Sequence, residues 1–194
     1  MDNGNGTTVR ILDVAERMLQ VRGYNGFSYG DVATELGITR AALHYHFPGK
    51  AELGQALIDR YAARFAAALE QLDATAPDAA AKLRGYVALY TDVLSADRMC
   101  LCGMLAAEHR TLPDPLQQAV CDFFTTNTVW LRKVIEEGSA DGSLRCPGTP
   151  EASASMVLGT LEGGMLIARL DGDVTRFAAT AEQLLAGLAP VRRA

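Results

Sequence analysis

Apolar residues recur three or four positions apart through most of the chain, which is the pattern of helices that bury one face. The repeat is most regular between residues 50 and 72, where it consists of Leu53, Leu57, Tyr61, Phe65, Ala68 and Leu72. Alternating β-branched runs, which would predict strands, are missing, and Ala, Leu, Glu and Arg dominate the periodic segments. The pattern therefore predicts an all-α fold.

Glycine and proline residues divide this pattern into about nine helices. We expect a helix near residues 8–22 and two short ones at 28–37 and 39–47. Longer helices are expected over residues 50–72, 78–96, 98–110, 113–138, 150–170 and 174–188. This order predicts a three-helix head, residues 1–50, and a larger C-terminal helical bundle, residues 51–194.

The second and third helices have the spacing of a helix-turn-helix. Ser28 can cap the first of the pair, with Asp31 as its capping-box partner. Ala33 supplies the small side chain that crossing helices need, and Gly37 can adopt the left-handed conformation of the turn. Leu43 then provides the apolar anchor of the second helix.

The opposite side of that third helix is poor in negative charge. At 100° per residue this side carries Arg40, Ala41, His44 and Tyr45. No carboxylate occurs from residue 36 to residue 51, although the whole chain has 23 Asp and Glu against 18 Lys and Arg. Lys50 begins the next helix, where free N–H groups and the helix dipole favour a phosphate. The patch suits a polyanion such as DNA, and a solvated helix face is the alternative.

Residues 37–53 (GITRAALHYHFPGKAEL) and 26–33 (GFSYGDVA) closely resemble the DNA-binding head of the TetR family of bacterial transcriptional regulators. The resemblance covers about residues 8–55 and implies that the third helix enters the major groove of double-stranded DNA. Thr39, Arg40 and Ala41 lie where relatives meet base edges or nearby phosphates. Backbone contacts are implied for Ser28, Tyr29, His44, Tyr45, His46 and Lys50. Relatives more often have an aromatic residue at the position of His44.

The same resemblance implies a pocket for a small-molecule effector among the fifth, sixth and seventh helices. Large soft side chains there would favour an uncharged or weakly polar ligand. They are Tyr86, Tyr90, Met99, Cys100, Met104, Phe123, Phe124 and Trp130. In one branch of the family a cysteine at the position of Cys100 senses electrophiles or oxidants in some members. An inert buried thiol and a zinc site of Cys100, Cys102 and His109 are the alternatives.

The resemblance also implies a homodimer, because the last two helices of each TetR subunit pair into a four-helix interface. Gly159 and Gly163 would allow close approach of helices, and Leu161 and Leu166 would add apolar area. Such a dimer would hold two heads about 34–36 Å apart and read a near-palindromic operator. We therefore expect a repressor that a small molecule or a thiol modification releases from DNA.

Signatures of enzymes and membrane proteins are missing from the chain. It has no nucleophile elbow, no phosphate-binding Gly-rich loop and no paired His with metal-ligand spacing, so we expect no catalysis, cofactor or metal. The apolar stretch at residues 156–170 is interrupted by Glu162 and is too short to span a bilayer. Charges in the first twenty residues and four cysteines indicate a cytoplasmic protein with reduced thiols.

Two other functions fit parts of the pattern. A helical protein-interaction module would use the third helix to contact a protein without DNA binding. A small thiol enzyme would use Cys100 as its nucleophile. Strong salt dependence of binding to duplex DNA would favour the regulator, and loss of turnover on mutating Cys100 would favour the enzyme.

Overall fold

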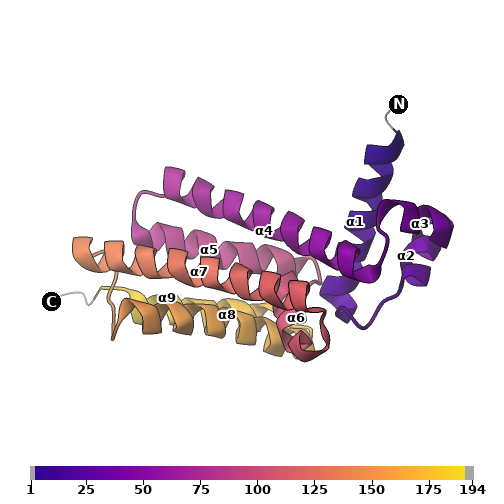
Figure 1. Cartoon of the computed structure of the whole chain (residues 1–194). Coiled ribbons are helices and arrows are strands. Elements are labelled where there is room, and N and C mark those ends of the chain that lie inside the picture. Colours follow the sequence, from indigo (N-terminus) through magenta and orange to yellow (C-terminus); the bar gives the residue numbers. More distant parts are fainter. Residues whose placement is uncertain (1–2, 191–194) are drawn as a thin grey trace. The chain divides into compact units, whose positions relative to one another are not determined.

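The computed structural model describes residues 3–190, and the side chains from Gly6 onward. Within this range it has nine α-helices, one turn of 3-10 helix and no strand, which confirms the predicted all-α fold (Figure 1). The helices are α1 (Asn3–Arg22), α2 (Tyr29–Leu36), α3 (Arg40–His46), α4 (Lys50–Thr75), α5 (Ala79–Ser95), α6 (Leu101–Ala107), η1 (His109–Thr111), α7 (Asp114–Asp141), α8 (Pro150–Asp171) and α9 (Val174–Leu188).

Two helices start more than one residue away from their predicted positions. Helix α1 begins at Asn3 instead of near residue 8, because extending an existing helix costs less than nucleating one. Helix α6 begins at Leu101 instead of residue 98. The backbone of Met99 is bound elsewhere, since its N–H donates to the Gln20 carbonyl at 3.2 Å and its carbonyl accepts from Gln20 Nε2 at 3.1 Å. This tertiary contact thus shifts the start of α6 to a later residue.

The chain forms two compact units. The described part of the first contains residues 3–64 and 98–123, and that of the second contains residues 65–97 and 124–190. Both α4 and α7 contribute one segment to each unit. The described part of the predicted head (residues 1–50), which is residues 3–50, belongs to the first unit, and a functional boundary at residue 50 remains a prediction.

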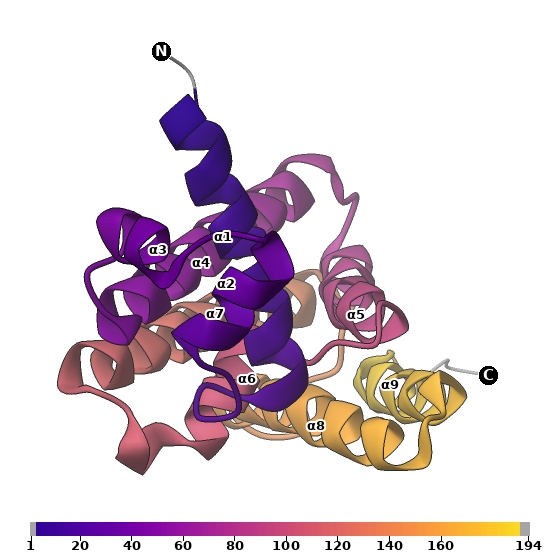
Figure 2. The same cartoon turned by 90° about the vertical axis from the view of Figure 1, so that its right-hand side faces the viewer.

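In the first unit, α2 and α3 are short helices beside α1 (Figure 2). Their shared core consists of side chains with exposures below one tenth: Ile11, Ala15, Leu19, Phe27, Val32, Leu43, Leu53 and Leu57. Burying these apolar side chains stabilises α2 and α3, which have only 8 and 7 residues and are too short to be stable alone. The packed core of the head therefore holds α3 in place with its outer side exposed.

In the second unit, α8 and α9 run side by side, and α5 packs on both (Figure 1). Gly172, with φ of 64°, ends α8 in the left-handed conformation and allows the tight connection to α9. A Cβ atom at Gly164 would lie 3.3 Å from the Phe177 ring, so the glycine permits this close approach. Of the helices described between residues 3 and 190, none is both long and apolar enough to cross a membrane.

Candidate nucleic-acid interface

Local hydrogen bonds fix the turn between α2 and α3. Ser28 Oγ accepts the Asp31 N–H at 3.3 Å and Asp31 Oδ2 accepts the Ser28 N–H at 2.7 Å, which is the predicted capping box. The Ser28 hydroxyl also donates to Asp31 Oδ2 at 2.7 Å, and this bond, followed by the one from the Ser28 N–H, lowers the pKa of Asp31. Gly37 is left-handed, with φ of 66° and ψ of 33°, and Thr39 Oγ1 accepts the Ala42 N–H at 3.1 Å. The predicted helix-turn-helix is thus confirmed in its local geometry.

The outer face of α3 consists of four exposed residues, Arg40, Ala41, His44 and Tyr45. The Tyr45 side chain is 86% exposed, and Leu43, on the opposite side of the helix, is fully buried. The predicted division of α3 into a buried apolar face and an exposed face is therefore confirmed. Free donors on an acid-free face can bind a polyanion.

Gly30 of α2 leaves the space that the Arg40 side chain occupies. A Cβ atom at residue 30 would lie 2.5 Å from Arg40 Nη2 and 3.2 Å from its Cζ. Within the described residues, no ion pair holds this guanidinium, so its donors are available to a ligand. Gly30 was not among the predicted site residues, because nothing in the helical pattern relates it to Arg40.

Tyr29 differs from its expected role as a phosphate contact. Its hydroxyl donates to the carbonyl of Phe47, at 2.9 Å, and to that of Gly49. The one phenolic proton is therefore occupied by the turn between α3 and α4. Burial, followed by the charge of Glu52, raises the pKa of Tyr29 to about 12. Tyr29 stabilises this turn instead of offering a free donor.

Lys50 also differs from expectation. Its ammonium donates to the Phe27 carbonyl at 2.5 Å and lies 4.5 and 4.6 Å from the ring centroids of Tyr24 and Phe27. Burial lowers the pKa of Lys50, and the charges of Glu108 and Asp31 oppose that shift. The ammonium is held by the fold of the head and is not an open phosphate ligand in this conformation.

The two histidines of α3 have different surroundings. His44 donates from Nδ1 to the Pro48 carbonyl at 3.0 Å and packs on the Tyr29 ring at 4.8 Å between centroids. Because a carbonyl only accepts, this bond places the proton of neutral His44 on Nδ1. His46 Nδ1 lies 2.9 Å from Thr8 Oγ1 and joins α3 to α1. His44 is thus oriented on the outer face, and His46 is partly used in packing.

Sequence reasoning missed the contacts that join the head to the segment after α6. Glu108 Oε2 accepts the Tyr24 N–H at 2.6 Å, and both carboxylate oxygens lie 3.3 Å from the Asn25 nitrogen. Asn25 Nδ2 also donates to Thr111 Oγ1 at 2.7 Å. No periodicity signals these bonds, because the partners lie more than eighty residues apart in the chain.

The predicted effector-pocket residues fall into two groups. Met99, Cys100, Met104 and Phe123 belong to the first unit, and Tyr86, Tyr90, Phe124 and Trp130 to the second. In the first group, Cys100 is only 1% exposed and accepts from the Gly103 N–H at 3.4 Å and from the Tyr61 hydroxyl at 3.6 Å. The thiol therefore caps α6 from the interior.

The second group surrounds a buried polar chain. The Tyr86 hydroxyl donates to Asn127 Oδ1 at 3.0 Å and lies 3.2 Å from the Tyr90 hydroxyl. Trp130 stacks on Tyr86 at 5.5 Å, and its Nε1 donates to Asp73 at 3.0 Å. Asn127, which is 2% exposed, was missed by the sequence reasoning, although it is a lone amide on an otherwise apolar side of α7.

The zinc alternative for Cys100, Cys102 and His109 is wrong. Among the residues with described side chains, no three metal-ligating groups come together. Cys102 is buried, and His109 Nε2 instead lies 3.7 Å from Cys121 Sγ.

The predicted dimer residues of α8 are divided between its two sides. Gly159 and Leu166 are exposed, and Cβ atoms at Gly159 and Gly163 would meet nothing within 4 Å. Leu161 is a wrong prediction, because it is fully buried in the core of the second unit and offers no surface to a partner. Three exposed apolar residues of α8 were missed, namely Met156, Ile167 and Leu170.

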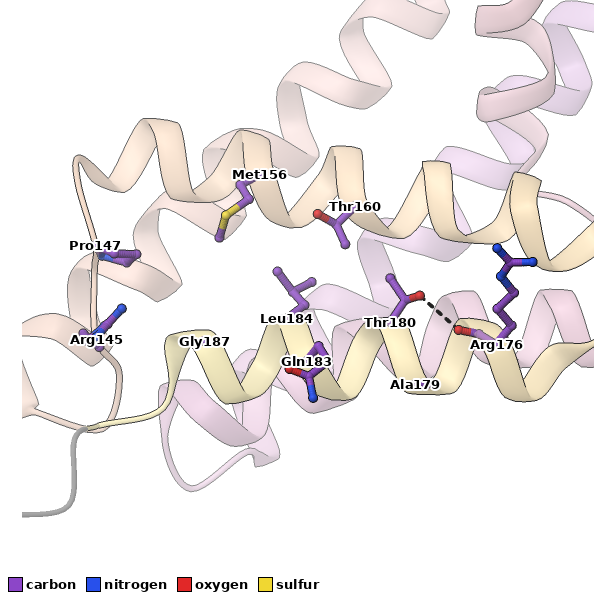
Figure 3. A pocket seen from close by; sticks show the side chains of 10 residues that line it. All are labelled: Arg145, Pro147, Met156, Thr160, Arg176, Ala179, Thr180, Gln183, Leu184 and Gly187. Carbon is purple, nitrogen blue, oxygen red and sulfur yellow. Dashed lines mark hydrogen bonds between the residues drawn. The ribbon is translucent and has the colours of Figure 1, made fainter.

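A groove of about 700 Å³ lies between α8 and α9. Met156 and Thr160 of α8 point toward Leu184 and Thr180 of α9 (Figure 3). Arg145 and Pro147 lie at one end of the groove and Arg176 at the other (Figure 3). The groove thus continues the exposed apolar side of α8.

Comparison with known proteins agrees with this architecture. Residues 11–57 match the family model of bacterial regulatory proteins of the tetR family, and residues 79–184 match the tetracyclin repressor-like C-terminal domain. Transcriptional regulator AcuR of Cereibacter sphaeroides is 29% identical over 162 residues, which are 79% of this chain and 72% of AcuR.

Solved structures extend the similarity to nearly the whole chain. A TetR-family regulator from Agrobacterium tumefaciens has a TM-score of 0.92 and 32% identity, and the match covers 95% of this chain and 98% of that one. A TetR regulator from Legionella pneumophila has a TM-score of 0.84 and 33% identity, with coverages of 92% and 95%. Both family models and these structures show that the chain belongs to the TetR family of bacterial transcriptional regulators.

Proposed function

We propose that this protein is a homodimeric repressor that binds a near-palindromic operator through α3 and leaves it when a small molecule binds or a thiol is modified. The outer face of α3 carries this proposal. Arg40 and Tyr45 project from it into solvent, and no carboxylate occurs from residue 36 to residue 51. In a chain with a net charge of −5, such a face is suited to local contact with DNA.

Arg40 is the residue best placed to read a base. Its guanidinium can donate two parallel hydrogen bonds to guanine in the major groove. Ala41 and Tyr45 would add contacts beside it, and the Thr39 hydroxyl would approach a phosphate. Ser28 is exposed and would lie near a phosphate at the start of α2, although its hydroxyl donates to Asp31. Such phosphate contacts fix the position of the head on the duplex without reading sequence.

The remaining residues of the head act by positioning. His44 presents Nε2 outward because Nδ1 is bound to the Pro48 carbonyl. Tyr29 holds the turn between α3 and α4, and Lys50 joins the start of α4 to the loop before α2, so both would affect DNA binding through the orientation of α3. His46 acts in the same way through its bond to Thr8.

The dimer would form through the exposed side of α8 and the groove beside α9. Gly159 and Gly163 allow a second helix to approach closely, since nothing lies within 4 Å of their missing side chains. Met156, Leu166 and Leu170 supply exposed apolar area. A two-fold axis here would give two heads, and their spacing would set the operator half-sites.

The effector would be recognised in part by the buried polar chain. The hydroxyls of Tyr86 and Tyr90 and the amide of Asn127 offer hydrogen bonds to a weakly polar ligand. Met99, Cys100, Met104, Phe123, Phe124 and Trp130 remain candidate contacts. The effector must bind the DNA-incompetent state more tightly, because a ligand with equal affinities shifts no equilibrium.

The link from effector to DNA would run through α6. The Gln20–Met99 bonds precede α6 and the Glu108–Tyr24 bond follows it, so both ends of α6 are tied to the C-terminal part of α1. A shift of α6 would pull on α1 and change the orientation of α3. A small change is enough, because both heads must dock together.

Thiol modification would act at the same place. Cys100 caps α6 from inside the first unit, so alkylation would add volume to a packed core and displace the sulfur that accepts the Gly103 N–H. The test is mass-spectrometric mapping of iodoacetamide adducts during DNA release. Cys100→Ser should prevent release by the electrophile, and release that persists in this variant would refute the thiol branch.

The DNA-binding proposal is tested by selecting bound duplexes from a random pool. The selected operator and a random duplex are then compared over a range of salt concentrations. Arg40→Ala should flatten base preference at one position of each half-site, at a cost of about 1–3 kcal/mol in discrimination. Arg84→Ala, an exposed arginine of α5, is the charge-matched control. Equal affinity of the unmutated protein for both duplexes would overturn the proposal.

A further inference from the structure

A small hollow in the first unit is lined by charged side chains alone. Its volume is about 340 Å³. The lining residues come from α1, from α4 and from the segment before α6: Asp13, Glu16, Arg17, Arg60, Arg64 and Arg98. The outer face of α3 and the predicted effector residues share no member with this set.

Most charges of the hollow are paired. Arg60 binds Asp13 at 2.7 Å and Glu16 at 2.6 Å. Arg64 binds the other oxygen of Glu16, and Arg17 binds Glu35. Glu16 is only 5% exposed and is shared by two guanidinium groups. One buried carboxylate thus holds α1 to α4 and already binds two arginines.

Arg98 is the exception. Its side chain is half-buried against the hollow, and between residues 6 and 190 no side chain forms an ion pair or hydrogen bond with it. The hollow therefore combines four guanidinium groups with two carboxylates. Even with Glu35 counted, the cations remain in excess, in a chain whose net charge is −5. Like charges held this close favour an additional anion.

We propose that this hollow binds a small dianion, either a phosphate group or a dicarboxylate, with Arg98 as its main ligand and Arg64 as the second. The planar guanidinium forks match paired oxygen atoms, which makes arginine suitable for both ligand types. The volume is at the small end of known ligand sites, and the charged lining disfavours an apolar molecule. The site is additional to the DNA and effector sites and does not depend on them.

The test is calorimetric titration of the unmutated full chain with inorganic phosphate and, separately, with succinate. Sodium chloride at equal ionic strength is the reference for both. Saturable binding of phosphate alone assigns a phosphate group, and binding of succinate alone assigns a dicarboxylate. Binding of both assigns a general dianion site. If neither ligand binds beyond the chloride reference, the proposal is wrong.

Three variants locate the binding. Arg98→Gln should raise the Kd of the bound dianion by about tenfold or more, because it removes a charged hydrogen-bond donor. It should fold normally, since Arg98 has no described partner to lose. Arg84→Gln makes the same charge change on α5 and should leave the Kd unchanged.

Asp13→Asn should change the Kd of the dianion in the opposite direction. Asp13 is 61% exposed, so its loss costs little stability, but it removes a negative charge from the lining. The Kd should then fall. An unchanged Kd in Arg98→Gln, or an equal rise in Arg84→Gln, would show that the anion binds elsewhere and would overturn the proposal.

Discussion

The carboxylate of Glu108 accepts the backbone N–H of Tyr24 at 2.6 Å across 84 residues of sequence. This bond satisfies a donor in the turn where α1 ends and Gly23 has a φ of 81°. A Cβ atom at Gly23 would lie 2.9 Å from Glu108 Oε1, so the turn has no room for a side chain. The segment after α6 is thereby attached to the helix that supports the DNA-binding head.

Replacing Glu108 should weaken both the fold and its response to effector. Glu108→Ala leaves the Tyr24 N–H without its acceptor, which should lower the free energy of unfolding by about 1–3 kcal/mol. Urea denaturation measures this loss, and DNA release by an effector found in a screen measures the response. Glu70→Ala, at an exposed position of α4, should change neither. Unaltered stability and release in Glu108→Ala would contradict the proposed link.

Gly30→Ala should reduce base discrimination without lowering the stability of the protein. The added Cβ would displace the Arg40 guanidinium, which lies 2.5 Å away, and base discrimination should fall by about 1–3 kcal/mol. Alanine in α2 should leave the melting temperature unchanged or raise it, since glycine costs about 0.5–1 kcal/mol in a helix. Fluorescence anisotropy with operator and random duplexes, together with thermal melting, tests both. Retained discrimination would show that Arg40 does not act from this position.

Lys50→Ala tests whether the Lys50 ammonium stabilises the head internally or binds a DNA phosphate. The Phe27 carbonyl would lose its donor and two rings would lose their cation, so stability should fall by about 1–2 kcal/mol. Affinity should fall alike for all duplexes, but the slope of affinity against salt should stay constant. A direct phosphate contact would instead reduce this slope by about one unit. Measuring the slope therefore decides between the two roles.

The raised pKa of Tyr29 predicts that the free energy of unfolding decreases in alkaline solution. Its pKa is raised from 10.0 to about 12 in the folded protein, so the neutral phenol is favoured by folding. The stability from this shift is complete below pH 10.0 and is lost as the pH rises toward 12. Chemical denaturation across this range should show a decline that is smaller in Tyr29→Phe. Identical pH dependence of the two proteins would contradict the assignment.

Leu166→Glu should disrupt the proposed dimer. The side chain is 52% exposed in one subunit, and a charge buried there without a partner should raise the dimer Kd by about 100-fold or more. Sedimentation or size-exclusion chromatography across a concentration series measures the Kd. Val129→Glu, at another exposed apolar position of the second unit, is the matched control. A dimer that survives Leu166→Glu and fails with Val129→Glu would place the interface on α7.

The sequence alone predicted the features that depend on neighbouring residues. The capping box of Ser28 and Asp31, the left-handed Gly37 and the cap at Thr39 use partners within a few positions. Helical periodicity likewise predicted that Leu43 is buried and Tyr45 exposed, because both lie on one short regular helix. The helix-turn-helix could therefore be recognised before any tertiary structure was known.

Tertiary structure decided the features that depend on distant residues. It directed the Lys50 ammonium to the Phe27 carbonyl and buried Leu161. The Gln20–Met99 bonds moved the start of α6 to Leu101, and packing brought the Glu108 carboxylate to the Tyr24 N–H. Periodicity identifies an apolar residue but does not say whether its own subunit or a second one covers it. Side-chain direction and long-range hydrogen bonds follow from how helices pack, and packing depends on the whole chain at once.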